Sequence, residues 1–311
     1  MPLTTSFAVY IVRVRNVETR KKETLSSILG EHDFLDLLAG YFDVIKRISP
    51  DNEGSQVILR VIKWVGEGRC FLGMIETGEY GVESILVDRK SKKDVYRRTQ
   101  DVADMWPFFF QFYIPHGTDE GVLILQRRGN YGIRHILYEL LASMVEKQFG
   151  DLRLRISPLV LEKELKRLLR GRATQVRYCR YNRSSDVADV AAGGHEESYG
   201  TMELIFKAKR GRYFDLSEKL KEILGGEPAN EVFELEDMDF GFSKVKVHLE
   251  QHGRPRQVDL SNLKNVRSYR DITDRLEALG KSHSDFDALG ELAADLLRET
   301  RKQMYGKADA P

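Results

Sequence analysis

An aromatic segment near the middle of the chain restricts the possible folds more than any other feature. Residues 107–114 read PFFFQFYI, a run in which glutamine is the one strongly polar side chain. Such a run favours a β-strand that is buried on both faces, or on one face with aromatic cross-strand pairs. A loop at 115–121 leads into a second apolar segment, Gly121–Leu125. The two segments together predict a buried β-hairpin.

Other strands also occur in pairs, and helical segments lie between the pairs. Segments 57–65 and 69–76 flank a glycine turn, and 244–260 reads as a hairpin that turns at 252–255. Further strands are expected at 7–14, 82–88, 173–181 and 201–209, with 89–98 as a basic connection. Helices are expected at 24–45 (bent near Gly30), 160–169, 216–224, 289–304 and from Ile133 onward. Because no sustained β-α-β alternation appears, we predict an α+β fold of mostly antiparallel sheets from β-hairpins packed with amphipathic helices.

The helix that begins at Ile133 has the clearest apolar periodicity in the chain. Its apolar residues recur at helical spacing: Ile133, Ile136, Leu137, Leu140, Leu141, Met144 and Val145. With 311 residues the chain is long enough for two domains. The segment SSDVADVAAGGHEES at 184–198 is rich in small and polar residues and is typical of a junction. We therefore expect an N-terminal α+β domain at 1–183 and a C-terminal α+β domain at 199–311.

Composition and motifs exclude several classes of protein. Cys70 and Cys179 are the only cysteines and lie in no CxxC motif, so neither a disulfide scaffold nor a structural zinc site is expected. The sequence predicts no cofactor. The N-terminus lacks the pattern of a signal peptide, and no apolar run approaches the roughly 20 residues of a membrane span. We expect a soluble, cytoplasmic protein that does not enter membranes.

A first candidate site lies between the aromatic hairpin and the Ile133 helix. The connection reads QRRGNYG at 126–132, and it leads to the free amides of a helix N-terminus, which favour anions. Arg127, Arg128 and Arg134 offer guanidinium groups for phosphate, and Tyr131 offers a ring for a base. The known nucleotide-binding motifs GxxxxGK and GxGxxG are absent. The alternative interpretation is a turn with positive-φ glycines and solvated arginines.

A second candidate site is a basic band in a chain whose net charge is only +1. The band consists of Lys163, Lys166, Arg167, Arg170, Arg172, Arg177, Arg180 and Arg183, followed by Lys207, Lys209, Arg210 and Arg212 near Tyr213. In a strand, Arg177, Cys179, Tyr181 and Arg183 would share one face, and Arg172, Tyr178 and Arg180 the other. Arginines that alternate with tyrosines suit phosphates and unpaired bases. The alternative is a solvated, charged surface.

Acidic residues near the C-terminal hairpin form a third candidate site. Asp237 and Asp239 precede Lys244 and Lys246, a combination that loosely indicates a metal-dependent nuclease. In such a site the carboxylates hold a divalent ion and the lysine orients the attacking water. The alternative is an acidic segment that balances the basic band. No other pattern in the sequence indicates catalysis, and no metal site is predicted elsewhere.

Two segments resemble proteins of a known biological context. IETGEYG from Ile75 and FFFQFYIPHGTDEGVLILQRRGNYGIRHIL from Phe108 are similar to uncharacterised proteins of bacterial phage-defence neighbourhoods. The resemblance covers the central third of the chain and contains no catalytic motif. It implies nucleic-acid sensing or membership of a defence complex.

Three functional hypotheses follow, and the first is preferred. In it, the protein is a non-catalytic nucleic-acid-binding component of a bacterial anti-phage system, and the arginines and lysines named above converge on one surface to bind phosphates. In the second, the aromatic strand Phe108–Tyr113 and the Ile133 helix form an interface with a partner protein or a second copy of the chain. In the third, the protein is a metal-dependent nuclease, and Asp237 and Asp239 of the acidic segment are its metal ligands.

Overall fold

The computed structural model describes residues 4–48, 51–52, 56–182, 200–235, 242–251, 254–266 and 269–306. The fold is α+β and its sheets are antiparallel, as the sequence predicts. The chain forms two compact units: unit 1 comprises Met1–Pro158 and Tyr269–Pro311, and unit 2 comprises Leu159–Ser268. Within the described residues, no helix has both the length and the hydropathy needed to cross a bilayer.

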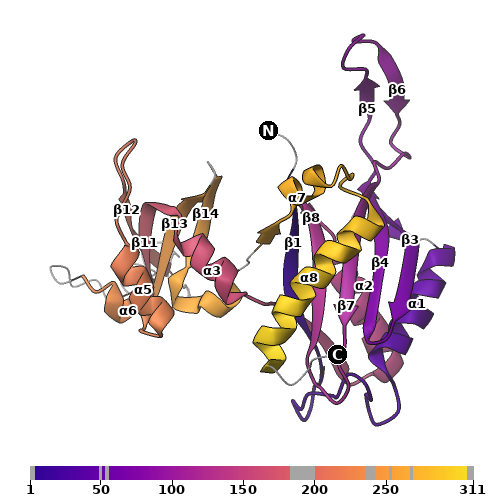
Figure 1. Cartoon of the computed structure of the whole chain (residues 1–311), viewed down its shortest axis with the longest axis horizontal. Helices are drawn as coiled ribbons and strands as arrows, with labels where there is room; N and C mark the ends of the chain where they lie inside the picture. The colour runs from indigo at the N-terminus through magenta and orange to yellow at the C-terminus, as the bar shows by residue number, and fades with distance from the viewer. Residues whose placement is uncertain are drawn as a thin grey trace, which may run out of the picture. The chain divides into compact units, whose positions relative to one another are not determined.

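Unit 1 is built on one large antiparallel sheet (Figure 1). Its strands are β1 (Thr5–Asn16), β2 (Asp51–Asn52), β3 (Val57–Glu67), β4 (Cys70–Glu79), β7 (Trp106–Tyr113), β8 (Gly121–Arg128), β9 (Tyr131–Gly132), β10 (Leu152–Pro158) and β15 (Tyr269–Asp271). They follow the order β10-β1-β8-β7-β4-β3-β2, with β9 beside β8 and β15 beside β1. The aromatic strand β7 is therefore an interior strand.

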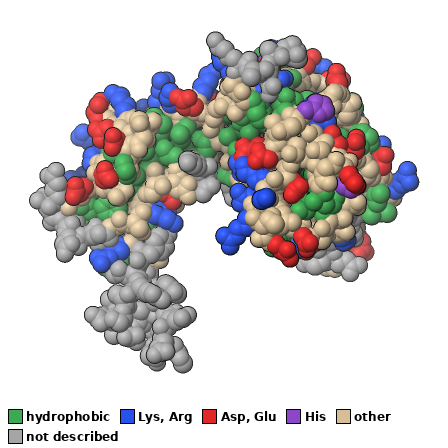
Figure 2. Space-filling model, turned by 90° about the horizontal axis from the view of Figure 1, so that it is seen from below, with side chains coloured by type: hydrophobic (Ala, Val, Ile, Leu, Met, Phe, Trp, Pro, Cys, Tyr) green, Lys and Arg blue, Asp and Glu red, His purple; other side chains and the backbone are tan. Residues whose placement is uncertain are grey.

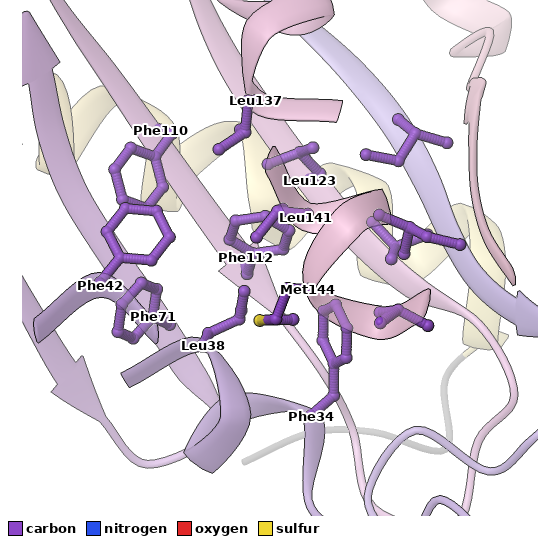
Figure 3. Packing of buried hydrophobic residues seen from close by; sticks show 14 of the residues in the cluster. Phe34, Leu38, Phe42, Phe71, Phe110, Phe112, Leu123, Leu137, Leu141 and Met144 are labelled. Atoms are coloured by element: carbon purple, nitrogen blue, oxygen red, sulfur yellow. The ribbon is translucent and has the colours of Figure 1, made fainter. Parts of the chain in front are cut away.

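Helices cover both faces of this sheet. Helices α1 (Phe34–Ile48) and α2 (Arg134–Phe149) pack on one face, where rings of α1, β4 and β7 meet (Figure 3). The Phe42 ring centroid lies 5.1 Å from that of Phe110 and 5.2 Å from that of Phe71. Helix α8 (Phe286–Tyr305) covers the other face, where Phe286 contacts Phe109 with ring centroids 5.7 Å apart. Of the two arrangements expected for PFFFQFYI, the structure has the strand buried on both faces: residues 108–114 are buried, and Pro107 is half-buried.

Buried polar contacts fix the C-terminal segment to the sheet. The Thr5 amide donates at 2.9 Å to Oγ1 of Thr273, the first residue of helix α7 (Thr273–Ala278). Gln126 is fully buried; its Nε2 donates to the His283 carbonyl at 2.6 Å, and its Oε1 accepts from the Phe109 amide at 2.8 Å. A buried amide with both ends satisfied specifies one docking geometry. The C-terminal segment is therefore an integral part of unit 1.

Strands β10 and β15 lie end to end along the same edge of β1. Strand β10 pairs with Tyr10–Asn16 and β15 pairs with Ser6–Ala8, while β8 occupies the opposite edge of β1. Pro158 lies opposite Tyr10, and Tyr269 lies opposite Ala8. Strands β10 and β15 together occupy the position of one strand beside β1, and the chain of unit 2 is inserted between them.

Two expectations for unit 1 are wrong. The helix expected from residue 24 begins only at Phe34, because Leu29 and Gly30 both adopt positive φ (53° and 84°), which an α-helix cannot contain. The segment 89–98, expected as a connection, contains strand β6 (Asp94–Arg98). It pairs with β5 (Ser84–Val87) in a separate two-stranded sheet.

Unit 2 is a smaller sheet with helices on one face. Its elements are α3 (Glu162–Leu169), β11 (Arg172–Asn182), β12 (Gly200–Lys207), α5 (Ser217–Gly225), α6 (Ala229–Val232), β13 (Lys244–Gln251), β14 (Arg254–Asp259) and a 3₁₀ segment, η1 (Leu260–Asn265). The strand order is β12-β11-β13-β14. Leucines of α3 and α5 pack on Val176, Val245 and Val247 to form a core separate from that of unit 1.

The expected boundary at 184–198 does not separate domains. Strands β11 and β12 pair from Gln175–Lys207 to Asn182–Gly200, so this segment connects two neighbouring strands of one sheet. Small polar residues are typical of hairpin connections as well as of linkers, which explains the error. The segment itself lies outside the described residues. The units divide at Pro158 and Tyr269 instead.

Candidate nucleic-acid interface

The surface of the unit 2 sheet opposite α3, α5 and α6 is called the open face, since no described helix of unit 2 packs on it. Strand alternation divides the side chains between the two faces. Val245, Val247 and Leu249 are fully buried against the helices, whereas Lys244, Lys246, His248 and Glu250 alternate with them on the open face. Gln175, Arg177 and Cys179 lie opposite these residues on β11.

A β-bulge places Arg172 on the open face. The register between β11 and β13 shifts between Ala173 and Gln175, so Arg172 pairs with Glu250 and Ala173 with Leu249. One extra residue in a strand shifts the alternation, so side chains before the bulge lie on the opposite face from the one that simple alternation predicts. The expectation that Arg172 shares a face with Tyr178 and Arg180 is therefore wrong. Tyr178 is buried on the helical side, and Arg180 shares that side.

Three buried side-chain nitrogens of the open face have no hydrogen-bond partner in the described structure: Gln175 Nε2, Arg177 Nε and His248 Nε2. Gln175 and His248 are directly opposite each other on β11 and β13, and Arg177 is the next open-face residue of β11. Gln175 Nε2 and Arg177 Nε are donors, and His248 Nε2 is a donor when it carries the ring proton. A buried donor without an acceptor costs roughly 1–3 kcal/mol. Acceptor oxygens of a ligand would remove that cost.

Positive charge exceeds negative charge around these three nitrogens. The open face carries Arg172, Arg177, Lys207, Lys244 and Lys246 against Glu203, Glu250 and Asp259. Arg177 Nη1 pairs with Glu203 at 2.9 Å. Among the described residues, no carboxylate forms an ion pair with Lys207 or Lys246. Burial lowers the pKa of His248, and the nearby charges of Arg177 and Lys207 lower it further.

The turn after β12 extends this basic surface. The Ala208 amide donates to Thr174 O, and the Phe214 amide donates to Ala173 O, so the segment between them lies beside the start of β11. This turn presents exposed Lys209, Arg210 and Arg212. Tyr213 is 42% exposed, and the Arg172 guanidinium lies 4.9 Å from its ring. An exposed ring beside several cations can stack on a base.

The basic residues of α3 do not belong to the open face. Leu165, Leu168 and Leu169 hold α3 against the other side of the sheet, so Lys163, Lys166, Arg167 and Arg170 are exposed on the side away from the strands. Lys166 pairs with Glu162 one helical turn away. The expectation that the whole basic band converges on one surface is therefore wrong for unit 2. Arg183 lies outside the described residues.

Tyr178 cannot stack on bases as the sequence suggested. Its ring contacts Phe206, Phe233 and Phe242 at centroid distances of 5.8, 6.4 and 4.8 Å. Burial raises the pKa of its hydroxyl. Tyr178 is a core residue, whereas Tyr213 and Phe206 are exposed aromatic residues of the described part of this unit.

The arginines of the first candidate site all contact rings of unit 1. Gly129 has φ 59° in a tight turn that pairs Arg128 with Tyr131, so β8 and β9 form a hairpin directly before α2. The guanidinium of Arg127 lies 4.2 Å from Tyr269, that of Arg128 lies 4.9 Å from Trp106, and that of Arg134 lies 5.5 Å from Tyr10. Tyr131 is 59% exposed and packs on Trp106. Burial lowers the pKa of Arg128. An anion site here stays a prediction.

The structure provides little for the other two hypotheses. Asp237 and Asp239 lie outside the described residues, and Lys244 and Lys246 belong to the open face. Within the described ranges, no three His, Cys, Asp or Glu side chains are grouped for a metal ion. The aromatic side chains of β7 from Phe108 to Tyr113 are buried inside unit 1. The apolar stripe of α2 packs on the same core, with Ile136 and Leu140 half-buried, so neither element presents the exposed apolar surface of the expected protein interface.

Gln175 and His248 were not identified from the sequence. The alternation KVKVHLE at 244–250 does predict that His248 lies on the face opposite the valines. Its position beside Gln175 depends on the pairing register, which a single sequence does not reveal. The sequence therefore indicates which face His248 occupies, but it does not indicate that Gln175 lies beside His248.

Charges elsewhere on the molecule are mixed in sign. Acidic and basic side chains alternate with apolar patches over the face shown in Figure 2, so no single-sign field covers it. Comparison with known proteins finds no family model that matches the chain and no significantly similar curated protein. The resemblance to phage-defence proteins consequently stays a prediction.

Proposed function

We propose that the protein binds nucleic acid through the open face of unit 2. One observation carries the proposal: side-chain nitrogens of Gln175, Arg177 and His248 that have no partner among the described residues occupy neighbouring positions of the open face. Lys207 lies opposite Gln175 and Lys246 lies opposite Arg177, and neither lysine forms an ion pair with a described carboxylate. Phosphate oxygens are acceptors and anions at once, so a phosphate group satisfies both features. Membership of an anti-phage system is part of the same proposal and depends on the resemblance alone.

The extent of the basic surface favours a polymer over a single small anion. Cations continue from Lys246 across Arg177 and Lys207 to the turn at Lys209–Arg212, and each successive strand contributes at least one. A track of cations across several strands matches a chain of phosphates. Tyr213, at the same end, offers a ring for an unpaired base. We therefore propose a single-stranded segment as the ligand.

Fluorescence anisotropy with labelled single-stranded oligonucleotides at several salt concentrations tests this. The variant combines Arg177→Gln, Lys207→Gln and Lys246→Gln. It should bind about tenfold or more weakly at low salt, and the slope of log K against log salt should fall by about 2, at roughly 0.7 per lost phosphate contact. The control combines Lys163→Gln, Lys166→Gln and Lys221→Gln, which remove equal charge from the helical side of unit 2. Equal loss in both variants would contradict a specific role for the open face.

A further inference from the structure

The hairpin of β5 and β6 has no hydrophobic core. It projects from unit 1, clear of the large sheet (Figure 1). Every side chain from Ile85 to Arg97 is exposed, including five large apolar ones: Ile85, Leu86, Val87, Val95 and Tyr96, which are 45–69% exposed. Isolated two-stranded hairpins are marginally stable in water, so this surface is suited to a partner that covers it.

Both faces of the hairpin combine apolar and basic side chains. Leu86 lies opposite Tyr96 on one face, and Arg98 follows on the same face. Ile85 lies opposite Arg97 on the other face. The base of the hairpin is anchored by the Gly81 amide, which donates to Gln100 O at 2.7 Å. The partner therefore has to contact both faces of a narrow, anchored ribbon.

The hairpin is strongly basic. Residues 84–98 contain Arg89, Lys90, Lys92, Lys93, Arg97 and Arg98 against Asp88 and Asp94, a formal charge of +4 in a chain whose total is +1. No carboxylate of the described chain forms an ion pair with any of these six cations. Four of them occupy the turn, where the Asp88 carboxylate accepts from the Ser91 amide and fixes the conformation.

We propose that the β5–β6 hairpin is an arm that enters the major groove of double-stranded DNA. That groove is about 12 Å wide and admits a two-stranded ribbon. Its phosphate walls would meet the basic turn and the arginines, and thymine methyl groups would meet the apolar side chains. The deep, narrow major groove of duplex RNA does not admit such an arm. This site lies in the other unit and binds a different form of nucleic acid from the open face, so it goes beyond the proposed function.

The distribution of residues along the hairpin disfavours a membrane. A hairpin that inserts into lipid needs an apolar tip, because charged groups at depth are costly. Here the tip is the charged sequence DRKSKK at 88–93, and the apolar residues lie nearer the base. The fixed positive charge of the tip instead matches a polyanion that the hairpin can penetrate tip first.

Binding of a 20-base-pair DNA duplex and of the matching single strand tests the proposal. Combining Lys90→Gln, Lys92→Gln and Lys93→Gln should weaken duplex binding about tenfold and lower the salt slope by about 2–3, at roughly 0.9 per phosphate. Single-strand binding should not change. Combining Leu86→Ser and Tyr96→Ser should weaken duplex binding without changing the salt slope. Combining Lys46→Gln, Lys147→Gln and Lys302→Gln, on exposed sites of α1, α2 and α8, removes equal charge and is the matched control for the lysine variant.

The outcomes separate this proposal from that for the open face. If the duplex does not bind, or if all variants bind it equally well, the hairpin does not bind the major groove of DNA. This conclusion would hold whether or not the protein binds the single strand. Hairpin-dependent binding to phosphatidylserine vesicles, with none to DNA, would overturn it in favour of a membrane. Loss of single-strand binding in the open-face variant, with duplex binding retained, would support both sites. Because the substituted residues are exposed, thermal unfolding should not change.

Discussion

At the scale of single residues, the protonation of His248 offers a test of the proposed binding at the open face. His248 faces Gln175 on β11, Gln257 on β14 and the cations Arg177, Lys207 and Lys246. Its pKa lies below the ordinary value because burial, and then the charges of Arg177 and Lys207, disfavour the charged imidazolium. If the open face binds a phosphate as proposed, its negative charge would oppose these cations and raise the pKa of His248, so that binding would be coupled to proton uptake.

Affinity for single-stranded nucleic acid should therefore increase as the pH falls through the interval between the pKa of His248 in the complex and its lower pKa in the free protein. His248→Gln should remove this increase and leave affinity at pH 8 nearly unchanged. Anisotropy titrations at constant ionic strength measure the effect. An equally steep pH dependence in the variant would show that another group titrates.

Two glycines of unit 1 should respond oppositely to alanine. A Cβ at Gly73 would lie 2.6 Å from Phe110 Cζ and 2.7 Å from the Lys63 carbonyl oxygen, so Gly73→Ala should cost about 1–3 kcal/mol of unfolding free energy. A Cβ at Gly290, in α8, meets nothing within 4 Å, so Gly290→Ala should stabilise by about 0.5–1 kcal/mol. Urea unfolding of both variants measures the difference. Destabilisation by Gly290→Ala would contradict the packing around α8.

At the scale of elements, α8 completes the core on the Phe109 side of the sheet. Leu289 is fully buried there, so Leu289→Ala should cost about 2–5 kcal/mol. Leu279, just after α7, is 53% exposed, and Leu279→Ala should change stability by less than about 0.5 kcal/mol. Chemical denaturation monitored by tryptophan fluorescence compares the two. A small effect at Leu289 would mean that α8 is not docked.

Elements with strong periodicity or turn signals were predictable from the sequence. Strands β7 and β8, helix α2 and the β3–β4 hairpin all appear within a few residues of expectation. Strand β10 was missed although its Leu152, Leu154 and Ile156 alternate with arginines. Strand β6 was missed because its exposed, basic sequence lacks the apolar alternation of a half-buried strand.

The candidate site was predictable only in part, because it depends on pairing. Arg177 and Lys207 were identified from local charge, and the structure places them on one face. Arg172 required knowledge of the bulge, and Gln175 required the register with His248. The basic residues of α3 were grouped with the strand because local periodicity does not reveal which side of a sheet a helix covers.

At the scale of the whole molecule, the two units should be separable. Pro158 and Tyr269 lie opposite residues two apart on β1, roughly 7 Å along the strand. Replacing residues 159–268 with about four Gly and Ser residues should leave unit 1 folded, with duplex binding retained and single-strand binding lost. The excised unit, which has its own core, should retain single-strand binding. Circular dichroism melts and both binding assays test this; an unfolded unit 1 would show that it needs unit 2.

Because unit 2 is inserted between β10 and β15, the ribosome completes unit 2 before it synthesises the last part of unit 1. Strand β7 leaves the ribosome early, but α8, which covers its Phe109 side, is made only after all of unit 2. Nascent chains should therefore expose the apolar surface around Phe109 until α8 has been synthesised, and such exposed surfaces are bound by chaperones. Protease digestion of stalled chains would reveal it: chains halted at Ser268 should be cut within β7, and those extended beyond Tyr305 should resist.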